Sequence, residues 1–220
     1  GSSARMSIVL GKRDIAWAEH ILGNSLLLTF AFGARCLGVG YSFLDDILGM
    51  FGASDLTLDY ARTYMLIVLP GMFFTTLTFN LTGLMRASGY PMKSMYILVS
   101  GAILNVILDP VFIFVFKWGI AGAAWATTIS MFLTGIASLL HFCSPKSFIR
   151  FRSHAWKPRL YIFKNILMIG MSPFLMNLAA SAVVAMLNTQ LLRYGGRLSG
   201  VFGENAADLA VGTYGIVNTF

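Results

Sequence analysis

Charged side chains are scarce in this sequence. Asp, Glu, Lys and Arg make up 11% of the 220 residues, whereas soluble globular domains contain about 25%. Hydrophobic residues account for 57% of the chain, and the mean hydropathy is +0.74. A soluble fold has too little interior to cover that much apolar surface, so the composition excludes one and predicts a polytopic membrane protein.

Regular alternation of polar and apolar residues, which marks the strands of a membrane barrel, is also missing. The apolar residues instead form long runs that contain many of the 22 glycines and 18 phenylalanines. A helix satisfies its own backbone hydrogen bonds and can therefore cross hydrocarbon without a partner strand. The predicted fold class is all-α, a polytopic bundle of membrane helices.

Cysteine and histidine are rare as well, with two and three residues. Cys36 and Cys143 belong to no CxxC motif and to no Cys/His ligand spacing, so we expect both to be packing residues. His20, His141 and His154 are predicted at helix ends or in loops, where solvent reaches them. Because no nucleophile lies beside a histidine, the sequence predicts that the chain is not an enzyme.

Acidic residues are outnumbered, nine against 16 Lys and Arg, which leaves a net charge of +7. A basic chain can bind nucleic acid, but here eleven of the 16 basic residues lie in three loops between apolar runs, at 1–20, 86–93 and 143–164. Basic loops of this kind face the cytoplasm by the positive-inside rule. We therefore exclude nucleic acid as a partner and expect residues 43–59 and Lys117 to be external.

The apolar runs are long enough to cross a hydrocarbon layer of about 30 Å. Before them, Gly1–Leu10 reads as the last turns of a helix, and Phe43–Asp59 reads as an acidic connection at the membrane interface. After them come a glycine-rich loop, Arg193–Asp208, and the start of a further helix, Leu209–Phe220. The five predicted spans are Ile21–Ser42, Tyr60–Met85, Pro91–Phe116, Gly119–Phe142 and Leu167–Leu192.

Asp109 is the only acidic residue inside these predicted spans. It lies in a helical hairpin, Tyr96–Ser130, whose turn is expected at residues 117–119. Asn105 precedes it by four residues, which places the two Cβ atoms on one helix face roughly 5–6 Å apart. Thr127 follows the turn by about as many residues as Asp109 precedes it, so both are predicted about 12–15 Å below the same membrane face.

Pro110 follows Asp109 directly and has no N–H, so the carbonyl of Val106 loses its helical partner and can turn toward a cation. A lone charged group in hydrocarbon costs about 2.5–3.5 kcal/mol and therefore suggests a functional site. The alternative is a protonated carboxyl group that caps a proline kink. The sequence leaves both open.

Several short motifs and their spacing are shared with a known family. The chain resembles the multidrug and toxic compound extrusion (MATE) transporters over essentially all of its residues, from the end of their second helix to the start of their eighth. The motifs are Gly1-Ser2-Ser3-Ala4-Arg5 with Gly11-Lys12, Arg86-Ala87-Ser88-Gly89-Tyr90-Pro91, Gly101-Ala102-Ile103-Leu104-Asn105, Leu108-Asp109-Pro110 and Gly119-Ile120-Ala121-Gly122-Ala123-Ala124.

The resemblance implies a two-lobe fold of twelve helices around a central cavity. Residues 1–142 would then form most of the N-terminal lobe. Residues 143–164 would form a cytoplasmic linker between the lobes, and residues 165–220 would begin the C-terminal lobe.

The resemblance also implies a cation site. In the first lobe, the family uses an Asn and an Asp one turn apart on helix five, a Thr on helix six and an Asp on helix one. Asn105, Asp109 and Thr127 match the first three. Some branches of the family place a carboxylate on helix seven, but Leu167–Leu192 contains none, so we expect ion coupling to rest on the first lobe.

The function implied is secondary active multidrug efflux across a bacterial cell membrane. We expect a monomer that exports small lipophilic cations in antiport with H⁺ or Na⁺, without a further cofactor and with Na⁺ as the candidate metal. A flippase for lipid-linked precursors, of the same broader superfamily, is the alternative. It would favour arginines for pyrophosphate, whereas the spans contain only Arg35, which we expect to snorkel to headgroups. A membrane scaffold would not require a carboxylate, an amide and a proline at one depth.

Overall fold

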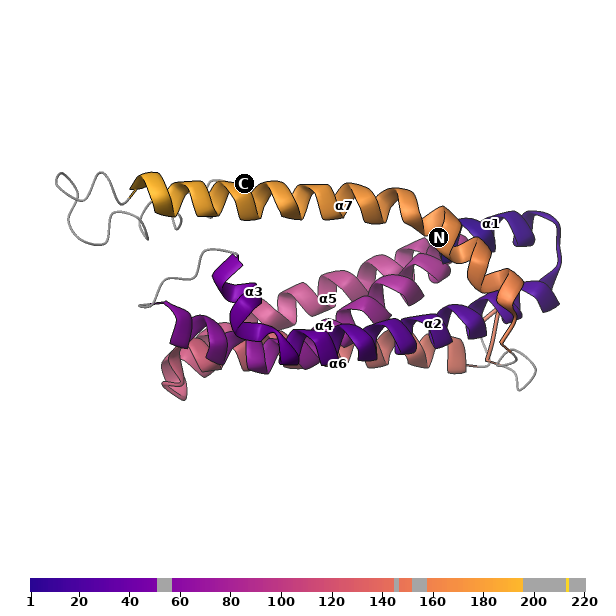
Figure 1. Cartoon of the computed structure of the whole chain (residues 1–220). Coiled ribbons are helices and arrows are strands. Elements are labelled where there is room, and N and C mark those ends of the chain that lie inside the picture. Colours follow the sequence, from indigo (N-terminus) through magenta and orange to yellow (C-terminus); the bar gives the residue numbers. More distant parts are fainter. Residues whose placement is uncertain (51–56, 145–146, 152–157, 196–212, 214–220) are drawn as a thin grey trace. The chain divides into compact units, whose positions relative to one another are not determined.

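The computed structural model of the chain describes residues 1–50, 57–144, 147–151, 158–195 and 213, and all regular secondary structure there is helical. This confirms the predicted all-α class. The glycine-rich loop and the final helix expected after residue 195 lie outside the described residues, apart from Thr213. The elements of Figure 1 are α1 (Ser2–Gly11), α2 (Ile15–Ser42), α3 (Leu44–Met50), α4 (Leu58–Ala87), α5 (Pro91–Pro110), the π-helix η1 (Val111–Val115), α6 (Gly119–Cys143) and α7 (Leu160–Gly195).

Five described helices are long and apolar enough to cross a membrane, which confirms the predicted number of spans. They are α2, α4, α5 continued through η1 to Val115, α6, and α7 as far as Leu191. The chain is therefore a multi-pass membrane protein.

Three helices begin earlier than predicted, α4 by two residues, at Leu58, and α2 and α7 by six and seven. Helix α2 starts at Ile15 rather than Ile21 because Asp14 caps it: the Trp17 N–H donates to the Asp14 carboxylate at 2.9 Å, a bond that satisfies one of the free donors of the first turn. Helix α7 starts at Leu160 rather than Leu167. It also continues through residues 193–195, which were expected to begin a loop.

The chain divides into two compact units. The first comprises Gly1–Tyr41 and Thr63–Ser172, and the second comprises Ser42–Arg62 and Pro173–Phe220. In the second unit, the Arg62 guanidinium pairs with the Asp45 carboxylate at 3.3 Å, and both side chains are more than half exposed. An exposed pair of this kind contributes at most about 1 kcal/mol, so it orients the start of α4 more than it stabilises it.

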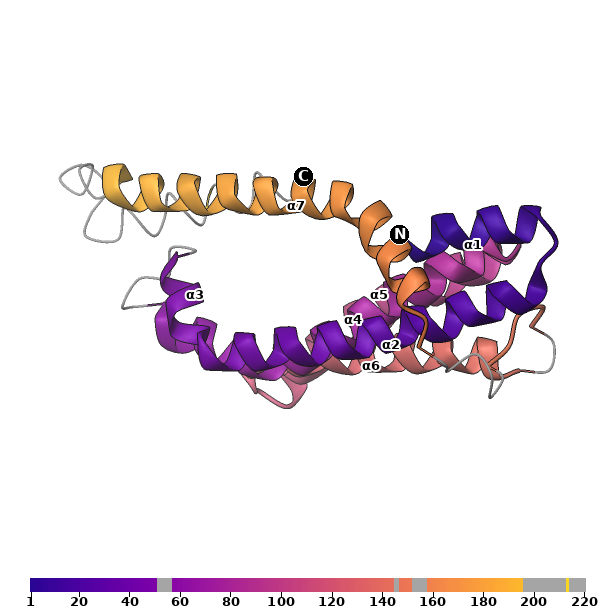
Figure 2. The ribbon, with the colours of Figure 1, turned by 45° about the vertical axis from the view of Figure 1, so that its right-hand side comes forward.

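Polar contacts give the order of helices in the first unit. The Asn80 amide of α4 donates to Thr29 of α2 at 2.9 Å and accepts from Ser2 of α1 at 2.6 Å. On the other side of α4, the Thr128 hydroxyl of α6 donates to the Ile67 carbonyl at 2.9 Å. Figure 2 shows α2, α4 and α6 side by side. Bonds between membrane helices average only about 0.6 kcal/mol, so they fix register while packing supplies most of the stability.

The segment after α6 packs onto this unit. Ile149 is 0% exposed and Ile162 is 3% exposed, and both join the core formed by α1, α2, α4 and α6. The Arg159 backbone N–H donates to the Asn24 side-chain oxygen at 2.8 Å, and its guanidinium lies 4.9 Å above the Trp17 ring. The described part of residues 143–164 is therefore anchored to the first unit.

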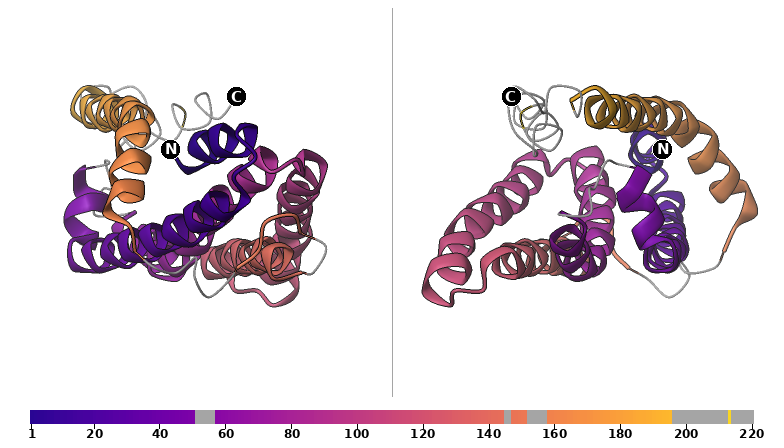
Figure 3. Two further views of the ribbon diagram at one scale, coloured as in Figure 1. Left: turned by 90° about the vertical axis from the view of Figure 1, so that its right-hand side faces the viewer. Right: turned by 60° about the vertical axis from the view of Figure 1, so that its left-hand side comes forward.

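Helices α5 and α6 form the predicted hairpin, seen as pink and salmon ribbons in the right panel of Figure 3. Its turn lies at residues 117–119, where Lys117 and Gly119 both have a φ of +56°. The break expected at Pro110 takes the form of a change from α-helix to π-helix. Since Pro110 cannot donate, the register shifts, and the Phe116 N–H reaches the Val111 carbonyl at 3.1 Å.

Candidate functional site

Asn105, Asp109 and Thr127 meet between α5 and α6. The Asn105 Nδ2 atom donates to Asp109 Oδ1 at 3.4 Å and to Thr127 Oγ1 at 3.3 Å. All three residues are half-buried. The structure thus brings together the three residues that the sequence singled out, one helical turn apart on α5 and across the hairpin on α6.

Each group in this cluster has a defined hydrogen-bonding role. The Thr127 hydroxyl donates to the Ala123 carbonyl of its own helix at 2.9 Å, which leaves its lone pairs free to accept. The Asn105 amide uses one hydrogen for each of the other two residues. Rotation of that amide would present its oxygen instead, so the cluster can offer a carboxylate, an amide oxygen and a hydroxyl to one cation.

The donor set suits a proton or a monovalent hard cation. Sodium in transporters is held by oxygen ligands at irregular helix segments, and one carboxylate balances one positive charge. Among the described residues, no group of three or more His, Cys, Asp and Glu could hold a metal ion.

The π-helix η1 lies directly beside the cluster. It begins two residues after Asp109, and π-helical turns are frequent at functional sites because they leave backbone groups outside the regular ladder. Its rings stack with those of the turn: Phe112, Phe116 and Trp118 lie 5.4–5.5 Å apart between centroids. This stack fixes the conformation of the segment that follows the carboxylate.

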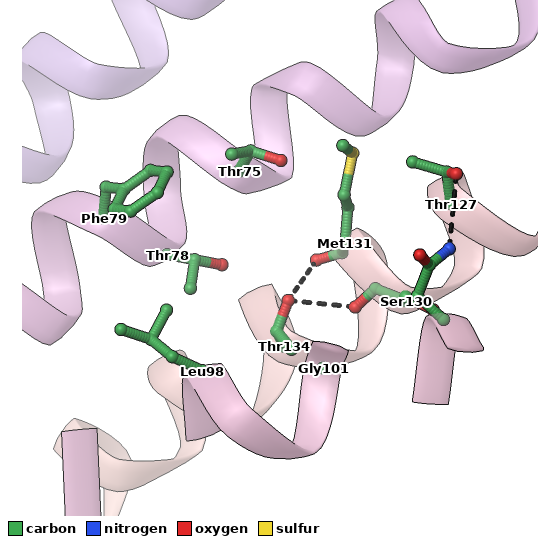
Figure 4. A pocket seen from close by; sticks show the side chains of 10 residues that line it. Thr75, Thr78, Phe79, Leu98, Gly101, Thr127, Ser130, Met131 and Thr134 are labelled. Atoms are coloured by element: carbon green, nitrogen blue, oxygen red, sulfur yellow. Dashed lines mark hydrogen bonds between the residues drawn. The ribbon is translucent and has the colours of Figure 1, made fainter. Parts of the chain in front are cut away.

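A pocket of about 220 Å³ opens next to the cluster. Figure 4 shows its labelled side chains, which come from α4, α5 and α6. Asn105 and Thr127 belong both to the pocket and to the cluster, whereas Asp109 is not part of the lining. The other lining residues are Thr75, Thr78, Phe79, Leu98, Gly101, Ser130, Met131 and Thr134.

The hydroxyl groups that line the pocket present hydrogen-bond acceptors to a ligand. Thr78 donates to the Phe74 carbonyl at 2.8 Å and Ser130 to the Ala126 carbonyl at 2.9 Å, each within its own helix. Thr75 and Thr134 do the same. With their hydrogens engaged, these oxygens present lone pairs, which favours a ligand that is cationic or that donates hydrogen bonds.

Sequence reasoning missed these hydroxyls. On α6, Ser130 and Thr134 follow Thr127 by three and seven residues, a spacing that predicts a shared helix face. That Thr75 and Thr78 of α4 would face the same space had no such signal, because no sequence period relates two helices.

Three other expectations are corrected, and that for Arg35 is not. Glu19 lies inside α2 and is 4% exposed, so Asp109 is not the only acidic residue within a span; the cap at Asp14 extends the helix over it. His20, expected to meet solvent, is 8% exposed for the same reason. Cys36 and Cys143, expected to pack, are both exposed. Arg35 is exposed on α2 and does not line the pocket.

Comparison with known proteins gives a consistent result. The family model described as MatE matches residues 1–111. The chain is 28% identical over 216 residues to the multidrug export protein MepA of Staphylococcus aureus, an alignment that covers 98% of this chain and 45% of MepA. The chain thus spans less than half the length of this relative.

Solved structures share the fold. An inward-facing multidrug resistance MATE family transporter superposes with a TM-score of 0.83 and 25% identity, covering 96% of this chain and 47% of that one. An outward-facing transporter of the same family superposes with a TM-score of 0.79 and 25% identity. That alignment covers 99% of this chain and 47% of the other. The similarity therefore extends over nearly all of the chain.

Proposed function

The chain belongs to the MatE family, and on that premise we propose that the protein containing it exports small lipophilic cations from bacteria in exchange for H⁺ or Na⁺. The observation that carries this proposal is the single amide of Asn105 that bridges a carboxylate on α5 and a hydroxyl on α6. We assign Asp109 as the residue that binds the coupling ion, with Asn105 and Thr127 as its partners.

The exchange follows from charge. Two unit charges about 6 Å apart at an effective dielectric constant of about 20 interact by about 3 kcal/mol, which is about 100-fold in affinity. One carboxylate therefore favours one cation at a time. An ion at Asp109 weakens the binding of a cationic drug in the adjoining pocket, and a bound drug weakens the binding of the ion.

Exchange becomes transport if the two ligands favour opposite conformations. The π-helix η1 is the element that we expect to respond, because it follows Asp109 directly and its backbone bonds are less regular than those of an α-helix. Neutralising Asp109 would weaken the bond that it accepts from the Asn105 amide and leave that amide freer to reorient against Thr127 of α6.

The substrate class is supported by the pocket. Its hydroxyls accept hydrogen bonds, and its Phe79, Leu98 and Met131 side chains suit a lipophilic body. At about 220 Å³ it is smaller than the roughly 300–1,000 Å³ of a typical drug site. We therefore assign to it only the cationic end of a substrate.

The flippase alternative has less support. A pyrophosphate group needs cationic partners, and Arg would serve best. No Lys or Arg is among the residues that line the pocket.

The test is Asp109→Asn in the full-length protein, measured as ethidium efflux from proteoliposomes with imposed H⁺ or Na⁺ gradients. The substitution keeps the size of the side chain and mimics the neutral acid, so folding and ethidium binding should persist while uphill transport is lost. Asp46→Asn, the same change at an exposed carboxylate of α3, is the matched control and should leave transport unchanged. Normal efflux rates and ion dependence in Asp109→Asn would show that this carboxylate is only a structural cap.

A further inference from the structure

Two glycines flank the cluster along the contact between α5 and α6. Gly101 of α5 faces Thr134 of α6, and Gly122 of α6 faces Phe112 of η1. Because the two helices are antiparallel, the two contacts lie on opposite sides of the hydrogen bond between Asn105 and Thr127. The cluster is therefore bracketed by a close helix contact at each side.

At Gly122 the contact is with backbone. A Cβ atom added there would lie 2.7 Å from the Phe112 carbonyl oxygen, 2.9 Å from its carbon and 3.2 Å from the Ile113 nitrogen. Backbone atoms cannot rotate away as a side chain can. The Phe112 carbonyl also accepts the Trp118 N–H at 3.2 Å, so moving it would strain the hairpin turn.

At Gly101 the contact is with a side chain held in place. An added Cβ atom would collide with the Thr134 methyl carbon, Cγ2. The Thr134 hydroxyl is bonded to the carbonyls of Ser130 and Met131, each at 2.9 Å, and this restricts its rotation. Relief would require α5 and α6 to separate.

The cluster has little tolerance for separation. Its one bond between the helices, from Asn105 to Thr127, already measures 3.3 Å, at the long end for a hydrogen bond, and at about 3.6 Å such a contact no longer counts as one. An increase of a few tenths of an ångström in helix spacing would therefore end the contact between Asn105 and Thr127.

We propose that Gly101 and Gly122 are positioning residues that set the spacing of α5 and α6, and through it the affinity of the cluster for the coupling ion. The inference rests on the proposed function of Asp109. Neither glycine touches the ion. Each acts through the distance between Asn105 and Thr127.

The test compares Gly122→Ala, Gly101→Ala and the double variant Gly101→Ala/Thr134→Ser in the full-length protein. Thr134→Ser removes the colliding methyl group and keeps the hydroxyl group, so in the double variant it should restore the spacing of α5 and α6 that Gly101→Ala increases. Gly38→Ala is the matched control, because a Cβ atom at Gly38 of α2 would meet nothing within 4 Å.

Two quantities are measured. The first is the ion concentration for half-maximal ethidium efflux, expected to rise at least tenfold in both single variants (one pH unit if the ion is H⁺). Ethidium affinity should be unchanged in Gly122→Ala, since Gly122 does not line the pocket. The second is the distance between spin labels at the exposed positions Ile103 of α5 and Leu133 of α6, expected to increase in the same variants. Gly38→Ala should match wild type in both. The double variant should return to the wild-type label distance, and because Gly101 and Thr134 both line the pocket, its ion dependence is compared with that of Thr134→Ser alone.

Wild-type values of both quantities in Gly101→Ala, or no restoration by Thr134→Ser, would overturn the inference. If Asp109→Asn abolishes coupling, a longer label distance in the glycine variants with an unchanged ion dependence would also overturn the inference. If Asp109→Asn transports normally, the proposed function fails instead, while the label distances still report the spacing. Should Gly122→Ala fail to fold, the Gly101 and Thr134 variants decide.

Discussion

Asn105 holds the candidate site together at the scale of single residues. Its amide is the only group of the three that can donate two hydrogens at once, and it uses them on different helices. Thr127 contributes a lone pair because its own hydrogen is directed to Ala123. The two neutral residues thus have separable roles: the amide orients the carboxylate, and the hydroxyl adds an oxygen.

Removing either neutral partner should weaken ion binding without abolishing it. We expect Asn105→Ala and Thr127→Val to raise the half-saturating ion concentration of full-length efflux about 10–150-fold, since one hydrogen bond to a charged group contributes about 1.5–3 kcal/mol. Thr127→Ser should stay near wild type because it keeps the hydroxyl group.

Thr76→Val is the matched control for Thr127→Val. Thr76 is exposed on α4 and bonds to the Met72 carbonyl of its own helix at 3.0 Å, so its loss should not affect ion dependence. An equal effect of Thr76→Val and Thr127→Val on ion dependence would show that Thr127 is not part of the ion-binding site.

The hairpin of α5, η1 and α6 is the element that sets the depth of the site. Its turn at residues 117–119 is tight, because Lys117 and Gly119, on either side of Trp118, both have left-handed backbone conformations. The proline that ends α5 and the ring stack beside it hold the irregular segment at one end of the hairpin. The loop charges then predict which end this is: the basic segments 86–93 and 143–164 lie at the opposite end, on the cytoplasmic side.

Cysteine labelling tests this orientation. In a full-length variant without native cysteines, a membrane-impermeant maleimide added outside cells should modify Lys117→Cys and spare Arg150→Cys. Both positions are exposed, so access differs only by the side of the membrane. Lysis before labelling, which should make both reactive, is the control. External labelling of position 150 but not of position 117 would invert the topology.

At the scale of the whole molecule, the chain divides into two compact units. The first unit has a continuous core to which the segment after α6 contributes Ile149 and Ile162. The second unit comprises Ser42–Arg62 and Pro173–Phe220. Since the relative MepA is more than twice as long as the matched region, we propose that transport requires residues beyond these 220.

The 220 residues expressed alone should not export ethidium from a pump-deficient bacterial strain, whereas the full-length protein should. Alternating access needs two parts that move against each other around a shared site, and the candidate site here lies within a single unit. Equal amounts of both proteins in the membrane fraction are the control. Efflux by the 220 residues alone would show that this chain is sufficient.

Much of the element layout could be predicted because it depends on local chemistry. The apolar runs located all five spans, and residues 117–119 marked the turn. The predicted starts of α2 and α7 are wrong. Because Asp14 caps α2, the helix includes Glu19 and His20, which the predicted span Ile21–Ser42 leaves out and which are both buried. Length and hydropathy detect the centre of a span better than its ends.

The sequence by itself determined that Asn105 and Asp109 share a face, since a helical period of 3.6 residues fixes neighbours four positions apart. It also determined that Thr127 lies near the same depth. Only the tertiary structure decided that Thr127 comes within 3.3 Å of Asn105, that Thr75 and Thr78 face the same pocket, and that Gly122 touches the backbone of η1. The physical reason is that contacts between helices depend on the rotation and spacing of each helix, which follow from packing over its whole length and not from any local pattern.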